Sequence, residues 1–119
     1  MDRILIVDDE FLIRYTLEEG LKDRGYDAYS AATVEEGLEF VRKYHPGVLL
    51  LDNLLENSVG MDEIVNFKNA DEELQVIMMT AYGSVSQAVE ATKRGAYDYI
   101  LKPFDVDEID MLIKRCLEQ

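Results

Sequence analysis

Five short apolar runs recur along this chain of 119 residues, and they constrain its fold more than any other feature of the sequence. Each run has the length of a single strand, and several are rich in β-branched residues. They cover residues 4–7, 28–31, 48–51, 76–79 and 97–101. Between them lie helical patterns, the clearest of which forms one apolar face from Ile109, Leu112, Ile113, Cys116 and Leu117. The chain is therefore predicted to alternate strands and helices.

Capping signals agree with this alternation. Three pairs place a capping side chain ahead of a partner that can reach back, which is typical of helix starts. They are Thr33 with Glu36, Ser84 with Gln87, and Asp105 with Glu108. Gly25 and Gly95 are expected where helices end, because glycine readily adopts the left-handed conformation found there.

The run at 48–51 reads Val-Leu-Leu-Leu without a polar residue, which indicates a sheet buried on both faces. Short alternating connections favour right-handed parallel crossovers between such strands. The sequence therefore predicts an α/β fold with a doubly wound, five-stranded parallel sheet. Residues 1–119 contain no long linker, internal repeat or low-complexity stretch, so we expect one domain over 1–119.

Acidic residues outnumber basic ones by 25 to 12, which gives a formal net charge of -13. Such a charge repels phosphate backbones and anionic membranes, so direct binding to nucleic acid or membrane is not expected. Cys116 is the only cysteine and cannot form an internal disulfide, which fits a reducing compartment. The apolar runs are too short for a signal peptide or a membrane span. We therefore expect a cytoplasmic protein.

Polar residues follow four of the predicted strands at their carboxyl ends, where ligands bind in sheets of this kind. Asp8 and Asp9 follow the first strand, and Asp52 follows the third. Thr80 follows the fourth strand and Lys102 the fifth. If the first and third strands are neighbours, the three carboxylates converge at one edge of the sheet.

Three clustered carboxylates repel one another, and a hard cation with oxygen ligands would compensate them. Magnesium is the expected ion, because it commonly bridges a few carboxylates to phosphate oxygens. Thr80 adds a hydroxyl donor and Lys102 adds a positive charge, and both suit a phosphoryl group. The pattern therefore indicates a magnesium-dependent phosphate site.

Each of these residues also has a purely structural explanation. Asp8 or Asp9 could cap the following helix. Asp52 and Thr80 could be ordinary turn residues at strand ends. Lys102 could be a solvated charge in a loop. The occurrence of all of them at strand ends favours a functional site.

Four stretches resemble the receiver domains of two-component response regulators, and the resemblance spans the chain. They read ILIVDDE at 4–10, VLLLD at 48–52, MTAYG at 79–83 and GAYDYILKPF at 95–104. The family implies the flavodoxin-like or CheY-like strand order 2-1-3-4-5, with helices on both faces of the sheet. The YGS at 82–84 and the GAYDY at 95–99 further resemble receivers at the front of enhancer-binding transcription activators.

The resemblance assigns roles to the carboxylates. It implies that Asp52 accepts a phosphoryl group, that Asp9 is a direct Mg²⁺ ligand and that Asp8 helps to bind the ion. Leu54 would contribute its backbone carbonyl to the same ion.

The resemblance also implies that Thr80 bonds the bound phosphoryl group and that Lys102 pairs with it. Tyr99 would be an aromatic switch residue, although a half-buried position in the last strand explains it equally well. Receivers usually hold the bond after this lysine in the cis form, so a cis bond is expected between Lys102 and Pro103.

The sequence departs from the family pattern after Asp52. In an ungapped comparison Gly60 matches a glycine that the family often has, and Asp62 matches a frequent acidic position. Glu56 then stands where a proline is usual, so the loop 53–59 lacks a rigidifying residue and is expected to be more mobile.

The function implied is that of a phospho-accepting signalling switch, not an enzyme. A histidine kinase or histidine phosphotransfer protein would donate the phosphoryl group, and slow self-dephosphorylation would follow. The fourth helix, fifth strand and fifth helix would form an output face for a second copy or an effector domain. One alternative is a small magnesium-dependent aspartyl-phosphate phosphatase, whose signature has an aspartate where this chain has Leu54. The other is a degenerate receiver that acts only as a binding module.

Overall fold

The computed structural model describes residues 2–55, 57–81 and 85–118. Its main sheet consists of β1 (Arg3–Val7), β2 (Asp27–Ala31), β3 (Val48–Asp52), β6 (Gln75–Thr80) and β7 (Asp98–Leu101). The helices are α1 (Phe11–Asp23), α2 (Val34–Tyr44), α3 (Gly60–Ala70), α4 (Val85–Lys93) and α5 (Val106–Leu117). The short strands β4 (Leu54–Leu55) and β5 (Ser58–Val59) form a separate antiparallel pair. Within the described ranges, no helix is long and apolar enough to cross a bilayer.

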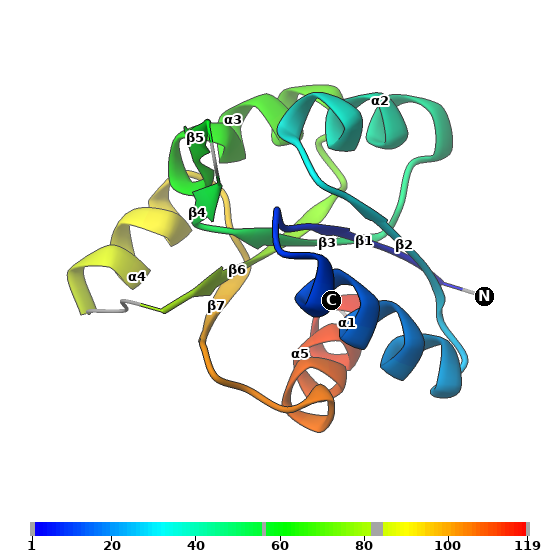
Figure 1. Ribbon diagram of the computed structural model, residues 1–119. Coiled ribbons are helices and arrows are strands. Elements are labelled where there is room, and N and C mark those ends of the chain that lie inside the picture. The colour runs from blue at the N-terminus through cyan, green and yellow to red at the C-terminus, as the bar shows by residue number, and fades with distance from the viewer. Residues whose placement is uncertain (1, 56, 82–84, 119) are drawn as a thin grey trace.

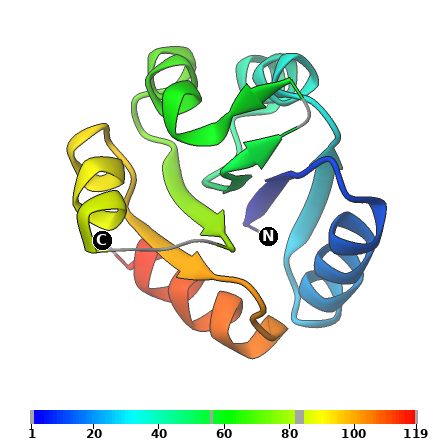
Figure 2. The same cartoon turned by 60° about the vertical axis from the view of Figure 1, so that its left-hand side comes forward.

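The strands of the main sheet are arranged in the order β2-β1-β3-β6-β7, and every neighbouring pair is parallel. Because β6 and β7 are the fourth and fifth strands of this sheet, the predicted order 2-1-3-4-5 is confirmed. Helices α1 and α5 lie together against one face, and α2 and α3 lie against the other (Figure 1). The turned view in Figure 2 shows the same sheet enclosed by helices. The doubly wound α/β fold predicted from the sequence is therefore present.

The sheet separates two apolar cores, because successive side chains of a strand point to opposite faces. In β1, Ile4 and Ile6 belong to the core beneath α1 and α5, whereas Leu5 and Val7 belong to the core beneath α2 and α3. All of β3 is buried, which confirms that the sheet is covered on both faces. The predicted apolar face of α5 lies in or against the first core, at Ile109, Leu112, Ile113, Cys116 and Leu117.

Two of the predicted helix caps are confirmed. At the start of α2, Thr33 Oγ1 accepts a hydrogen bond of 3.2 Å from the backbone N–H of Glu36. At the start of α5, Asp105 and Glu108 form a reciprocal capping box. The third predicted cap, Ser84, lies outside the described residues.

Two glycines follow the last turns of α1 and α4, as predicted. Gly25 has a φ of 91° and Gly95 a φ of 113°, and L side chains rarely adopt either conformation. At Gly95 a Cβ atom would also lie 3.3 Å from Cγ of Lys68. Glycine is therefore the residue best suited to end both helices.

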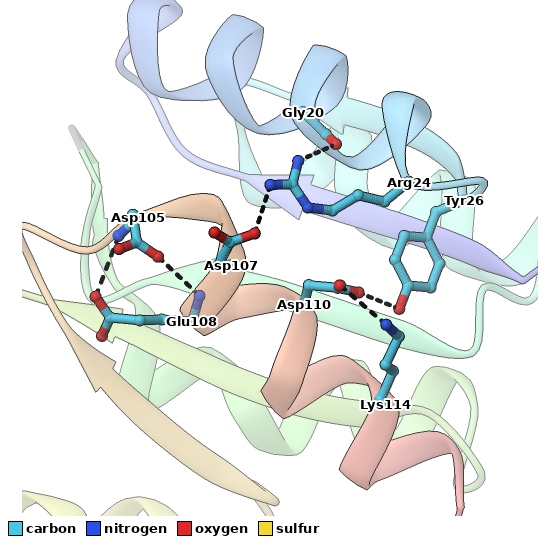
Figure 3. Close-up of polar contacts among 8 residues, drawn as sticks. All are labelled: Gly20, Arg24, Tyr26, Asp105, Asp107, Glu108, Asp110 and Lys114. Atoms are coloured by element: carbon cyan, nitrogen blue, oxygen red, sulfur yellow. Dashed lines mark hydrogen bonds and ion pairs between the residues drawn. The ribbon is translucent and has the colours of Figure 1, made fainter.

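A polar clasp joins the segment after α1 to α5 (Figure 3). Arg24 Nη2 donates to Asp107 Oδ1 at 2.6 Å, and the Tyr26 hydroxyl donates to Asp110 Oδ1 at 2.6 Å. Lys114 Nζ donates to the second oxygen of Asp110 at 3.1 Å. The clasp fixes α5 against α1 on the face of the sheet that both helices cover.

The clasp shifts the ionisation of its members. Burial, together with the hydrogen bond to Asp110, raises the pKa of Tyr26, so the hydroxyl stays protonated and donates. Burial acts to raise the pKa of Asp110, but the hydrogen bonds from Tyr26 and Lys114 outweigh it and lower that pKa. Asp110 therefore stabilises the fold as a carboxylate.

Replacing Tyr26 by Phe should lower the free energy of unfolding by about 1–2 kcal/mol at pH 7, because a hydrogen bond to a charged group is lost. The lowered pKa of Asp110 makes this stabilisation disappear as the pH falls through the folded-state pKa. Urea unfolding at pH 7 and at acid pH measures the effect. Tyr15→Phe, at an exposed ring on α1, is the control, and equal stability of the two variants at pH 7 would contradict the prediction.

Candidate functional site

Three carboxylates meet at the carboxyl edge of the sheet. Strands β1 and β3 are paired with Val7 opposite Leu51, so the residues that follow, Asp8 and Asp52, emerge side by side. One carboxylate oxygen each from Asp8, Asp9 and Asp52 lies within 4.8 Å of the others. The structure thus brings together the three acidic residues that the sequence analysis singled out.

The protein environment intensifies the repulsion within this cluster. Asp8 is fully buried and Asp52 is 4% exposed, whereas Asp9 is the most exposed of the three. Two like charges 4 Å apart repel by about 4 kcal/mol at an effective protein dielectric constant of about 20. Some of this cost is offset from within the chain, by a lysine.

Lys102 supplies the positive charge. Its Nζ lies 3.1 Å from Asp8 Oδ2 and 3.1 Å from Asp52 Oδ1, and its side chain is 16% exposed. Its backbone N–H donates to the carbonyl of Thr80 at 2.8 Å, which anchors the end of β7 to the end of β6. The bond between Lys102 and Pro103 is cis, as the family resemblance implied.

Backbone contacts hold the turn that carries Asp8 and Asp9. The Asp8 N–H donates to the carbonyl of Ala31 at 3.2 Å, and Asp8 Oδ1 accepts from the N–H of Glu10 at 2.9 Å. Arg14 Nη1 donates to the Asp8 carbonyl at 2.8 Å. The N-cap of α1 is Glu10 and makes no side-chain cap bond, so helix capping does not explain the acidic pair.

The sequence analysis missed Arg14, which contacts the backbone of Asp8. It lies one helical turn after the acidic pair, at the spacing that places a side chain back over the start of its helix. A basic residue at that position was the available signal. Its bond to the carbonyl of Asp8 adds a second positive group beside the acidic cluster.

The site shifts the pKa of its central carboxyl. Burial, followed by the charge of Asp8, raises the pKa of Asp52 to about 6, and the hydrogen bond from Lys102 only partly opposes this. Burial acts to lower the pKa of Lys102, but its bonds to Asp8 and Asp52 outweigh burial and raise it. At neutral pH both groups are therefore charged, and the Asp52 carboxylate is held at a cost.

The donor set fits a hard divalent cation. Its members are carboxylate oxygens gathered from two adjacent strand ends, and such cations take oxygen ligands. The carboxylates of Asp8 and Asp52 could turn from Lys102 toward a cation, because a bound cation would offset their mutual repulsion, which Lys102 offsets only in part. The cluster is therefore suited to a metal site.

A short hairpin follows Asp52, within the segment 53–59 that the sequence analysis expected to be more mobile. Leu54 pairs with Val59 and Leu55 pairs with Ser58. At Gly60, directly after the hairpin, a Cβ atom would lie 2.2 Å from the carbonyl oxygen of Asp52, so no other residue fits there without a shift. The glycine thus has a steric reason, and four residues of the segment are paired.

Thr80 and Tyr99 lie on the neighbouring strands β6 and β7. Thr80 is buried at the end of its strand, beside Lys102. Tyr99 is half-buried, as the structural explanation of this residue predicted, and it lines a cavity of about 10 Å³ together with Thr80 and Asn53. The two candidate switch residues are thus close enough to share one cavity.

Comparison with known proteins identifies the family. The profile of the response regulator receiver domain matches residues 4–114, and the chain therefore belongs to that family. Sporulation initiation phosphotransferase F of Bacillus subtilis strain 168 is 38% identical over 116 residues, which cover 98% of this chain and 94% of that protein. Regulatory protein AtoC of Escherichia coli strain K12 is 36% identical over 118 residues, which cover 99% of this chain but 26% of AtoC.

Solved structures agree with this assignment. The solution structure of the beryllofluoride-activated NtrC4 receiver domain dimer matches with a TM-score of 0.92 and 35% identity, over 99% of this chain and 98% of that one. The chain is thus similar in extent to isolated receivers, and it spans about a quarter of the longer regulator AtoC.

Replacing Asp52 by Asn should stabilise the metal-free protein at pH 7, by at most about 3 kcal/mol. The pKa of Asp52 is raised to about 6 in the fold, so its ionisation costs stability as the pH rises through that value. Below the unfolded-state pKa the wild-type carboxyl is protonated in both states, and the advantage of the variant should vanish.

The measurement is urea unfolding in a chelator at pH values from below the unfolded-state pKa of Asp52 up to pH 8. Glu72→Gln removes one charge from an exposed position and serves as the control. An Asp52→Asn variant that gains no more stability than this control at pH 7 would contradict the account of the site.

Proposed function

We propose that the chain is a phospho-accepting switch in which Asp52 receives a phosphoryl group from a histidine kinase or a histidine phosphotransfer protein. The observation that carries the proposal is the cluster of Asp8, Asp9 and Asp52, with Lys102 paired to two of its members. Mg²⁺ would be held by the three carboxylates and by the backbone carbonyl of Leu54. When bound, the ion would supply positive charge to the phosphoryl oxygens.

The transfer itself is a displacement at phosphorus. A carboxylate oxygen of Asp52 forms the new P–O bond, the P–N bond of the phosphohistidine breaks, and the partner's imidazole keeps the bonding electron pair. Because the pKa of Asp52 is about 6, its carboxylate is ionised at neutral pH and needs no base. The chain therefore contributes mainly position and electrostatic stabilisation.

Lys102 and Thr80 would bind the group once it is attached. In the structure the ammonium of Lys102 already reaches Asp52, so a small movement would let it follow the negative charge onto the phosphoryl oxygens. Thr80 ends the adjacent strand β6 and offers a hydroxyl donor. Phosphorylation would draw Thr80 toward Asp52 and change the packing around Tyr99, which lines the same cavity.

This change would reach an output surface formed by α4, β7 and α5. Among the side chains that the structure describes, α4 exposes the large apolar side chain of Val89, β7 that of Leu101 and α5 that of Met111. Exposed apolar groups favour a protein partner, such as a second copy or an effector domain. The activated NtrC4 receiver, which has the same fold, is a dimer, and this supports self-association.

Two other functions are compatible with an acidic site, a small phosphatase and a degenerate receiver. Membership of the receiver family counts against the phosphatase. A small phosphatase would turn over outside substrates, whereas a receiver would only accept a phosphoryl group and lose it slowly by hydrolysis. A degenerate receiver would bind partners without accepting phosphate. The ion pairs of Lys102 with both Asp8 and Asp52 support a functional phosphoacceptor site over a degenerate one.

Incubation with acetyl phosphate and Mg²⁺ should add one phosphoryl group to the protein, detected by intact-protein mass spectrometry. Asp52→Asn or a chelator should abolish the adduct, while Asp62→Asn, at an exposed carboxylate on α3, should leave it unchanged. Equal labelling of Asp52→Asn would refute the assignment of the acceptor. No labelling of the wild type, by acetyl phosphate or by a phosphorylated histidine phosphotransfer protein, would favour the binding module.

A further inference from the structure

Asn53, which directly follows Asp52, makes more structural contacts than a turn residue requires. It is 9% exposed, and its N–H donates to the carbonyl of Met79 at 2.9 Å, which extends the pairing of β3 with β6. Its carbonyl accepts from the N–H of Gly60 at 2.6 Å, and its side-chain Oδ1 accepts from the N–H of Met61 at 3.0 Å. Asn53 thus joins the end of β3, the neighbouring strand β6 and the start of α3.

The bond to Met61 is a helix cap supplied from a distance. The first turn of a helix leaves N–H groups without intrahelical partners, and the residue before the helix usually satisfies one of them. In α3 that residue is Val59, which makes no side-chain cap bond. Asn53 takes over this role from the end of β3, with its carbonyl on Gly60 and its amide oxygen on Met61.

These two bonds close a ring around the β4–β5 hairpin. The hairpin begins at Leu54 and ends at Val59, directly between Asn53 and the helix that Asn53 caps. Both ends of the hairpin are therefore tied to one residue. The backbone orientation of Leu54 relative to the Asp52 carboxylate depends on that tie, because Leu54 is the next residue along the chain.

The geometry points to Asn53 as a positioning residue for the metal: we propose that its cap on α3 holds the hairpin so that the Leu54 carbonyl faces the cation bound by the acidic cluster. The inference rests on the proposed function, because it assumes that Mg²⁺ binds there.

The residue type fits this role. An apolar residue would leave the Met61 N–H without its acceptor, and an aspartate would accept the bond but place a further negative charge beside Asp52. Asparagine supplies the oxygen without the charge. Substitution by Ala therefore removes the side-chain part of the tie, the bond to the Met61 N–H, without changing the charge of the site; the backbone bond to Gly60 stays.

The test is the dissociation constant for Mg²⁺, measured from backbone amide shifts of the labelled protein during titration with MgCl₂. Asn53→Ala should bind Mg²⁺ about tenfold more weakly, as is typical when a support for a metal ligand is lost. Asn53→Asp, which restores the acceptor for Met61, should bind at least as tightly as the wild type. Thr33→Ala removes the cap of α2 instead and should leave the constant unchanged.

Several outcomes would overturn the inference. Unchanged Mg²⁺ binding in Asn53→Ala would do so, as would equal weakening in Thr33→Ala, which would trace the loss to general destabilisation. Asn53→Asp binding as poorly as Asn53→Ala would show that the cap does not matter. If the spectrum shows that Asn53→Ala is unfolded, Asn53→Gln, whose acceptor is displaced by one methylene, takes its place under the same criterion.

Failure of the inference is distinguishable from failure of the proposed function. Asp9→Ala removes an expected ligand and is titrated alongside. If the wild type does not bind Mg²⁺, or if Asp9→Ala binds it equally well, the proposed metal site is wrong. If binding depends on Asp9 but not on Asn53, the metal site stands and only the positioning role is wrong.

Discussion

Repulsion among Asp8, Asp9 and Asp52 is the constraint on which the rest of the site depends. The parallel pairing of β1 with β3 brings their carboxyl ends together, so Asp8 and Asp52 project from adjacent backbone positions and Asp9 follows in the same turn. Two apolar cores hold that sheet in place. Lys102 offsets part of the repulsion through its contacts with Asp8 and Asp52, and the remaining negative charge is available for a cation.

The same geometry connects the site to the surface of the protein. The strands that end at the site also carry Thr80 and Tyr99, which line one cavity with residues of α4, so a change at Asp52 has a short route to that helix. On the opposite side, the clasp of Arg24 and Tyr26 on α5 ties that helix to α1. We therefore expect α4 and β7 to respond to phosphorylation more than the end of α5 that the clasp holds.

Most of the fold and the position of the site could be predicted from the sequence, because both depend on local patterns. Apolar runs gave the strands, and the caps at Thr33 and Asp105 follow from short-range hydrogen bonding. The β4–β5 hairpin and the cap that Asn53 places on α3 were missed. They depend on contacts between separate segments, and the departure of the chain from its family after Asp52 removed the pattern that could have revealed them.

The most direct test of the account is urea unfolding of the wild type and Asp9→Ala, with and without Mg²⁺ at fixed ionic strength. Without metal, Asp9→Ala should be the more stable protein, because one repelling charge is gone. Mg²⁺ at a hundredfold excess over its dissociation constant should stabilise the wild type by about 2.7 kcal/mol and the variant by much less. A variant that is less stable without metal, or that keeps the full response to Mg²⁺, would contradict the assignment of this acidic cluster as a metal site.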